Sequence, residues 1–291
     1  MSIGNNFKID DKRKLTMKFA SVLIICSLTF TSTLSFAQEK LGIVLMHGKQ
    51  GGGAGDKSLD LLNQKLHDAG MLVIKPELPW SFNRYIDSDW DAAMSEIHTH
   101  VQKLKELGAQ KIALVGHSLG SPAALSYAAR YPGEVHALGL LAPGHVPLYY
   151  SQCIPYSPIK QCGVKEGVEQ ARKEMDAGHG DNKRPRVDIN QGRRNTVWMT
   201  ARDYLSYFDP ESDAEMAITA PKLPANVAAL WVIGDKDYLI KEGRQYVFDK
   251  LPANKKKQVS RGFRQSPVHA IGGLRSNRPV AQRQHDRLRH R

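Results

Sequence analysis

The hydrophobic positions of this chain fall into short apolar runs separated by amphipathic segments. A run that is apolar at nearly every position is typical of a strand buried on both faces of a parallel sheet. Such runs lie at residues 41–46, 71–74, 111–115, 137–141 and 230–233. A last strand is expected at 255–259, and we predict that these runs form one mostly parallel sheet.

Apolar residues recur at helical spacing between the predicted strands. The clearest helix is expected over residues 91–107, where the pattern stops before Gly108. Shorter helices are expected after Ser58, as a helix cap, and after Ser118. Strands alternating with helices of this length predict βαβ units, and therefore helices on both faces of the sheet.

A long segment between the fourth and fifth predicted strands breaks this alternation. We expect no strand in this segment, because residues 163–195 are charged and rich in Gly and Pro. One helix is expected over residues 196–208. An insertion at this point leaves from the carboxyl edge of the sheet, where open α/β sheets bind ligands. We therefore interpret residues 145–220 as a cap or lid.

Charge is concentrated at the two ends of the chain. The 291 residues carry a formal charge of +12, of which residues 1–37 contribute +3 and residues 255–291 contribute +10. Residues 38–254 are near neutral, so the basicity gives no support for a nucleic-acid partner of the folded domain.

The N-terminus has the pattern of a signal peptide. A basic segment precedes the apolar run 19–28, and Ser35 and Ala37 are small residues at the positions that a signal peptidase recognises. We expect residues 1–37 to be removed, with Met17 as an alternative start, and an uncleaved membrane anchor as the alternative. The mature protein is then expected in the bacterial periplasm or medium, without stable membrane association.

Two cysteines remain after removal of that segment. Cys153 and Cys162 can close a small loop in an oxidising compartment, so a local disulfide is expected. A metal site and a catalytic cysteine are the alternatives, but no second pair of ligands has matching spacing. We expect neither a metal nor an organic cofactor.

The strongest chemical motif follows the third predicted strand, where residues 116–120 are Gly-His-Ser-Leu-Gly. In the Gly-x-Ser-x-Gly pattern the serine occupies a tight strand-to-helix turn, and the glycines let neighbouring backbone pass closely. This places the Ser118 hydroxyl at a helix N-terminus above the sheet edge. The alternative is that Ser118 only caps the helix.

A glycine-rich segment follows the first predicted strand, with the sequence Met-His-Gly-Lys-Gln-Gly-Gly over residues 46–52. Backbone N–H groups at such a turn can stabilise the oxyanion of a tetrahedral intermediate. We expect the amides of Leu119 and Lys49 to be the donors, with Gln50 as the alternative to Lys49. A plain flexible loop is the other possibility; a phosphate-binding loop is excluded, because Gly-x-x-x-x-Gly-Lys-Ser/Thr is absent.

An acidic pair follows the fifth predicted strand, in Ile-Gly-Asp-Lys-Asp over residues 233–237. Serine-hydrolase chemistry needs a carboxylate that orients the histidine, and an acid after a later strand supplies it. Asp237 is our candidate and Asp235 the alternative, because Asp235 is better placed to hold the turn.

These three motifs resemble those of the α/β-hydrolase superfamily, and in particular small exported bacterial hydrolases of uncharacterised type. The resemblance covers residues 41–254. It implies the α/β-hydrolase fold, with a cap inserted after the fourth strand, and a serine hydrolase acting on a carboxylic ester or related acyl bond through an acyl enzyme. It also implies that Ser118 is the nucleophile, that Lys49 and Leu119 form the oxyanion hole, and that Asp237 is the acid.

The resemblance ends where the family places its catalytic base. Residues 261–291 are rich in Arg, Gln and His and show no amphipathic helix. We interpret this tail as disordered, or as the product of a reading-frame shift near residue 260. Within the printed sequence His269 is the candidate base by position, and His145 is a more distant one.

Two further histidines lie within the motifs, and the sequence also leaves other functions open. His47 and His117 are expected to shape their turns rather than accept a proton. The predicted protein is a monomeric enzyme with a small-molecule acyl substrate. The alternatives are a catalytically impaired hydrolase-fold protein that lacks the C-terminal base, and a binding protein.

Overall fold

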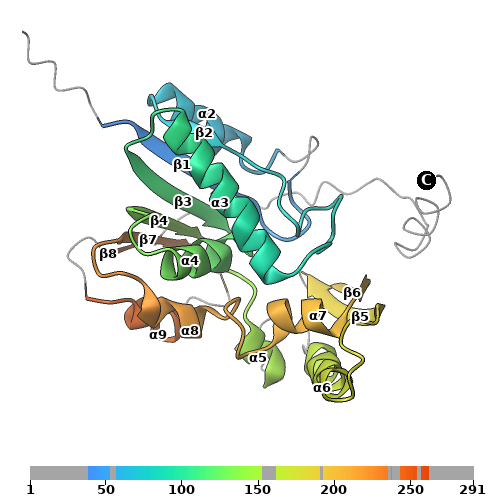
Figure 1. Ribbon diagram of the computed structural model, residues 1–291. Helices are drawn as coiled ribbons and strands as arrows, with labels where there is room; N and C mark the ends of the chain where they lie inside the picture. Colours follow the sequence, from blue (N-terminus) through green and yellow to red (C-terminus); the bar gives the residue numbers. More distant parts are fainter. Residues whose placement is uncertain are drawn as a thin grey trace, which may run out of the picture. The chain divides into compact units, whose positions relative to one another are not determined.

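A six-stranded parallel sheet forms the centre of the protein, with strand order β2-β1-β3-β4-β7-β8 (Figure 1). The strands are β1 Leu41–Met46, β2 Leu72–Ile74, β3 Lys111–His117, β4 Ala137–Leu141, β7 Ala228–Ile233 and β8 Lys257–Arg261. Each neighbouring pair of strands is parallel. The predicted strands and the predicted parallel sheet are thus confirmed.

The computed structural model describes residues 39–52, 57–152, 162–190, 193–234, 237, 243–253 and 257–261. The predicted signal peptide, the tail beyond Arg261, and Cys153 lie outside these ranges. Cys162 is described only as the first residue of a helix, so the predicted disulfide also lies outside the described residues. In the described ranges, no helix combines the length and the apolar character needed to cross a membrane.

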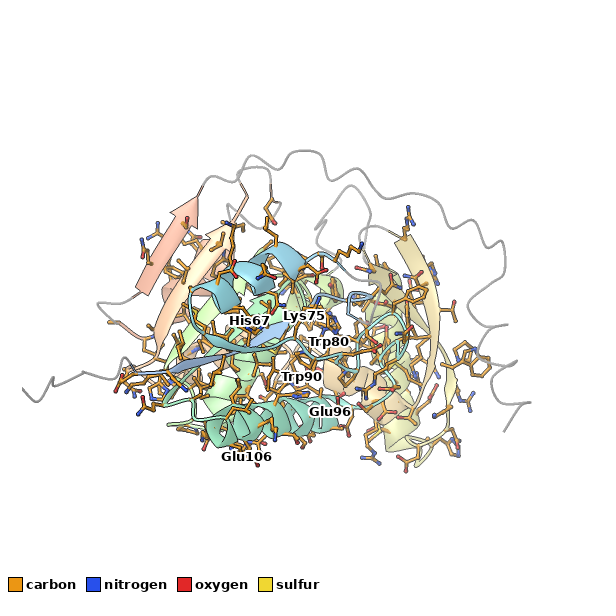
Figure 2. The ribbon with its side chains drawn as sticks, turned by 90° about the horizontal axis from the view of Figure 1, so that it is seen from above. His67, Lys75, Trp80, Trp90, Glu96 and Glu106 are labelled. Atoms are coloured by element: carbon orange, nitrogen blue, oxygen red, sulfur yellow. The ribbon has the colours of Figure 1, made fainter. Side chains whose placement is uncertain are left out.

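Alternation along β1 assigns the two faces of the sheet. Val44 and Met46 pack into the main core together with helices α3 (Trp90–Glu106) and α4 (Gly120–Arg130). Ile43 and Leu45 face the other way, into a smaller cluster with α2 (Asp60–Asp68). Seen from above, α2 and α3 lie on opposite sides of β1 (Figure 2). Helices therefore cover both faces, as predicted.

Helices α3 and α2 differ in whether a side chain caps their first turn. Helix α3 begins where Asp89 caps it, its carboxylate accepting a hydrogen bond from the Ala92 amide at 2.7 Å. Helix α2 begins at Asp60 after Leu59, and no side chain caps it. The prediction that Ser58 caps this helix is therefore wrong.

The insertion between β4 and β7 contains both helices and strands. Its elements are α5 Pro147–Ser151, α6 Cys162–Asp176, β5 Arg184–Asn190, β6 Arg193–Met199, α7 Ala201–Phe208, α8 Met216–Thr219 and the 3₁₀ helix η1 Ala220–Lys222. Strands β5 and β6 form an antiparallel pair, which we call the cap hairpin (Figure 1). After β7 follow the short helices α9 Gly243–Tyr246 and η2 Phe248–Lys250.

The cap hairpin corrects two predictions, the absence of strands and the helix over 196–208. Residues 196–199 belong to β6, and the helix begins only at Ala201. The charged character of residues 163–195 gave no strand pattern, yet Arg186 and Asp188 within that range are buried on β5, where each forms an ion pair. Buried ion pairs of this kind hide a strand from any pattern based on hydrophobicity.

Candidate active site

Ser118 lies at the turn between β3 and α4, in a backbone conformation that few residues adopt. Its φ angle is +51°, in the left-handed region where a residue with a side chain is strained. The turn is closed by a hydrogen bond from the Ser121 amide to the Ser118 carbonyl at 3.0 Å. Ser118 is half-buried, and its hydroxyl bonds to no other described residue. The predicted strand–turn–helix arrangement is confirmed.

The two glycines of the motif are required by close backbone contacts. A Cβ atom at Gly116 would lie 2.0 Å from the carbonyl oxygen of Gly120. A Cβ atom at Gly120 would lie 2.8 Å from the carbonyl oxygen of Met46, at the end of β1. A side chain at either position would therefore push β3 away from α4, or α4 away from β1.

The candidate residues share one edge of the sheet because their strands are parallel. Ser118 follows β3, the glycine-rich loop (residues 47–52) follows β1, and Asp237 follows β7. The carboxyl ends of parallel strands meet at the same edge, where α/β sheets place their sites. Asp237 is described there, its amide donating to the Gly234 carbonyl at 3.0 Å. Asp235 and His269 lie outside the described residues.

The glycine-rich loop packs directly against Ser118. A Cβ atom at Gly48 would lie 2.9 Å from the Ser118 Cβ. The Gln50 amide donates to the Trp80 carbonyl at 2.8 Å, so it is already occupied. The amides of Lys49 and Leu119, in contrast, donate to no acceptor in the described part of the chain. This difference favours Lys49 over Gln50 as an oxyanion donor.

His47 is built into the loop as a structural residue. Its Nε2 accepts a hydrogen bond from the Leu78 amide at 3.0 Å, so the ring proton resides on Nδ1, which donates to the Gly48 carbonyl at 2.8 Å. The buried indole of Trp80 donates to the His47 carbonyl at 2.8 Å. Figure 2 shows Trp80 beside Trp90 on the α3 side of the sheet. With both nitrogens occupied, His47 supports the loop, as its position in the motif suggested.

The segment after β4 is part of the site and was not predicted to touch Ser118. A Cβ atom at Gly144 would lie 2.9 Å from the Ser118 Oγ, and the Gly144 amide donates to the Ser118 carbonyl at 3.2 Å. The Ser118 amide in turn donates to the Leu141 carbonyl at 3.0 Å. The only hint in the sequence was that this segment also follows a strand of the sheet.

His145 lies beside these contacts but is buried. Its Nε2 donates to the Tyr207 carbonyl at 2.5 Å, and Nδ1 is left without a partner in the described part of the chain. Burial, together with the nearby charge of Lys49, lowers the pKa of His145 from 6.5 to about 3. His145 is therefore neutral at physiological pH and is held by Tyr207 rather than by Ser118.

This histidine predicts a specific acid sensitivity. Below pH 6.5 the unfolded chain binds a proton at His145 that the folded chain excludes down to about pH 3, so the free energy of unfolding falls as the pH falls through this window. Between pH 7 and pH 5 the loss amounts to about 2 kcal/mol. We expect urea titrations to show this loss in the wild type and to show it reduced by that amount in His145→Gln. Equal losses in both proteins would contradict the assignment.

Comparisons with known proteins agree with the architecture. A family described as the alpha/beta hydrolase fold matches residues 56–157. No curated protein matches the sequence. Within the described ranges, no group of three or more His, Cys, Asp or Glu side chains is arranged to hold a metal ion.

Three solved structures show how far the likeness extends. A carboxyl esterase from Bacillus coagulans has 16% identity and a TM-score of 0.54, over 78% of this chain and 83% of that one. Est1E from Butyrivibrio proteoclasticus, with ferulic acid bound, has 16% identity and a TM-score of 0.53, over 78% and 82%. A monoacylglycerol lipase from Paleococcus ferrophilus has 19% identity and a TM-score of 0.52, over 76% and 83%. At these identities the likeness is one of fold.

Proposed function

We propose that this chain, which has the α/β-hydrolase fold, is a serine hydrolase of carboxylic esters or related acyl bonds. The observation that carries the proposal is Ser118 itself, a half-buried serine at a strained turn with φ +51°. Strain of this kind persists where the surrounding structure holds the side chain in place for a function. The esterases and the lipase that share the fold support the ester as the substrate class.

The proposed reaction begins with attack of the Ser118 Oγ on the acyl carbon. The carbonyl electrons move onto oxygen, and the amides of Lys49 and Leu119 stabilise that charge. The positive end of helix α4 adds to this stabilisation. When the tetrahedral intermediate collapses, the bond to the leaving oxygen breaks and the alcohol departs with a proton, leaving an acyl enzyme. Water then repeats the attack and releases the acid.

The proton transfers need a base, for which we propose His269, oriented by Asp237. Asp237 follows β7 at the same sheet edge as Ser118, which is where an orienting carboxylate would serve this reaction. Among the described histidines, His47 has both ring nitrogens occupied and His145 is bonded to Tyr207. These contacts leave the C-terminal histidine as the better candidate.

Turnover of p-nitrophenyl acetate and p-nitrophenyl butyrate by the full chain tests the proposal. We expect steady hydrolysis preceded by a burst of about one equivalent of p-nitrophenol per active chain, because an acyl enzyme accumulates when deacylation is slow. If the purified chain releases p-nitrophenol no faster than Ser118→Ala, the proposal fails. A catalytically impaired hydrolase-fold protein or a binding protein would then be the better account.

A further inference from the structure

The cap hairpin is bonded to the glycine-rich loop through two neighbouring residues of that loop. The Lys49 Nζ lies 2.5 Å from the Asp188 Oδ1 of β5, and 3.5 Å from the Ile189 carbonyl oxygen. The next residue, Gln50, accepts a hydrogen bond at its Oε1 from the Asn190 Nδ2 at 2.9 Å. The loop that packs on Ser118 therefore takes part of its support from the inserted cap rather than from the sheet.

The ion pair between Lys49 and Asp188 is almost completely shielded from water. The exposed fractions of the two side chains are 6% and 0%. The Tyr85 hydroxyl donates to the second carboxylate oxygen, Oδ2, at 3.3 Å, and the Phe208 ring lies under the ammonium with its centroid 5.1 Å away. Removing one partner of such a pair leaves the other charge buried and uncompensated, so the geometry of the pair is strongly held.

The glycine-rich loop is held at several backbone points around Lys49. His47 is fixed by Leu78 and Trp80, and the Gln50 amide is fixed by the Trp80 carbonyl. Between these points the Lys49 amide donates to no described acceptor. The Gly48 carbonyl of the same peptide unit accepts hydrogen bonds from the His47 Nδ1 at 2.8 Å and from the Gly51 amide at 3.0 Å. The buried end of the Lys49 side chain adds a further contact, and this is the one that the cap hairpin supplies.

We propose that Asp188 is a positioning residue that keeps the Lys49 amide aimed at the oxyanion. The inference rests on the proposed serine-hydrolase function, and it makes the cap hairpin part of the catalytic support. Removing one oxyanion donor lowers kcat by about 10²- to 10³-fold in serine hydrolases. A variant in which the donor is present but wrongly oriented should lose less kcat than a variant in which the donor is removed.

Replacing Asp188 tests the proposal with a kinetic readout. In Asp188→Ala we expect kcat for p-nitrophenyl butyrate, per active site titrated with a fluorophosphonate, to fall between about 10-fold and about 100-fold. KM should stay within about twofold, because the amide acts on the oxyanion and not on the bound ester. If Asp188→Ala does not fold, the same kinetics are measured with Asp188→Asn, which keeps the side-chain volume and a hydrogen-bond acceptor.

The same strand offers a matched control. The Arg186 Nη2 pairs with the Glu174 Oε2 at 2.6 Å, and the exposed fractions of these side chains are 3% and 8%. This pair ties β5 to α6 and does not touch the glycine-rich loop. Glu174→Ala should therefore lower the stability, as Asp188→Ala does, but leave kcat per active site unchanged within about twofold.

Lys49→Met completes the test because it keeps the backbone amide and removes the charge. We expect Lys49→Met, Asp188→Ala and the double variant to lose kcat to the same degree, since all three break one interaction. If both Asp188 variants keep the wild-type kcat while Ser118→Ala is inactive, this inference is overturned and the proposed function stands. If the wild type itself reacts with neither the ester nor the fluorophosphonate, both are overturned.

Discussion

Ser118→Ala is expected to lower the turnover of p-nitrophenyl butyrate by at least about 10⁴-fold. In the proposed mechanism the substitution removes the oxygen that forms the acyl enzyme and leaves the proposed oxyanion donors in place, so a small residual rate should remain. The effect should appear almost entirely in kcat. Steady-state hydrolysis by the two proteins, with the thermal midpoint measured in parallel, gives the comparison.

Ser126→Ala provides the matched control for that substitution. Ser126 lies on the same helix, α4, and its buried hydroxyl accepts a hydrogen bond from the Trp90 indole at 3.0 Å. Its loss should cost about 1 kcal/mol of stability and leave turnover within about twofold of the wild type. Equal rates in the wild type and Ser118→Ala would show that another group performs any hydrolysis observed.

Gly116→Ala should destabilise the fold by about 3 kcal/mol, the upper part of the range for overpacking. The new Cβ would lie 2.0 Å from the Gly120 carbonyl oxygen and 2.6 Å from the Ser121 nitrogen, both of which are backbone atoms. Neither atom can move without shifting the start of α4. The free energy of unfolding in urea, followed by circular dichroism, measures the cost.

Gly139→Ala is the corresponding control, in the neighbouring strand β4. Its new Cβ would lie 3.2 Å from the Val115 Cγ2, and a side chain can give way by a few tenths of an ångström. We expect a cost below about 1 kcal/mol. If the two alanine variants are equally stable, the close approach at Gly116 does not constrain the turn as the structure indicates.

The sequence alone predicted those features that depend on residues close to one another along the chain. The inner strands β1, β3 and β4 were recognisable because they are largely buried and therefore continuously apolar. The turn at Ser118 was recognisable because the glycines that its backbone needs lie two positions before and after it. Asp237 was selected by similar reasoning, because it follows a predicted strand, and its role as the acid stays a prediction.

The inserted segment was predicted, but its cap hairpin was not, because the decisive contacts of that hairpin join distant parts of the chain. Lys49 and Asp188 are 139 positions apart, and neither position carries a local pattern that identifies its partner. A charged residue within a strand is taken for an exposed one unless its buried partner is known. The contact of Gly144 with the Ser118 Oγ was missed for a related reason, since it depends on the exact path of the chain after β4.

Reaction with a fluorophosphonate tests the central claim, that Ser118 is an activated nucleophile, most directly. The probe forms a covalent bond only with a serine whose oxygen is both nucleophilic and accessible, so it does not depend on guessing the natural acyl group. We expect one adduct per chain, located by mass spectrometry on the peptide that contains Ser118, and no adduct in Ser118→Ala. An unmodified wild type, or an adduct that persists in Ser118→Ala, would contradict the claim.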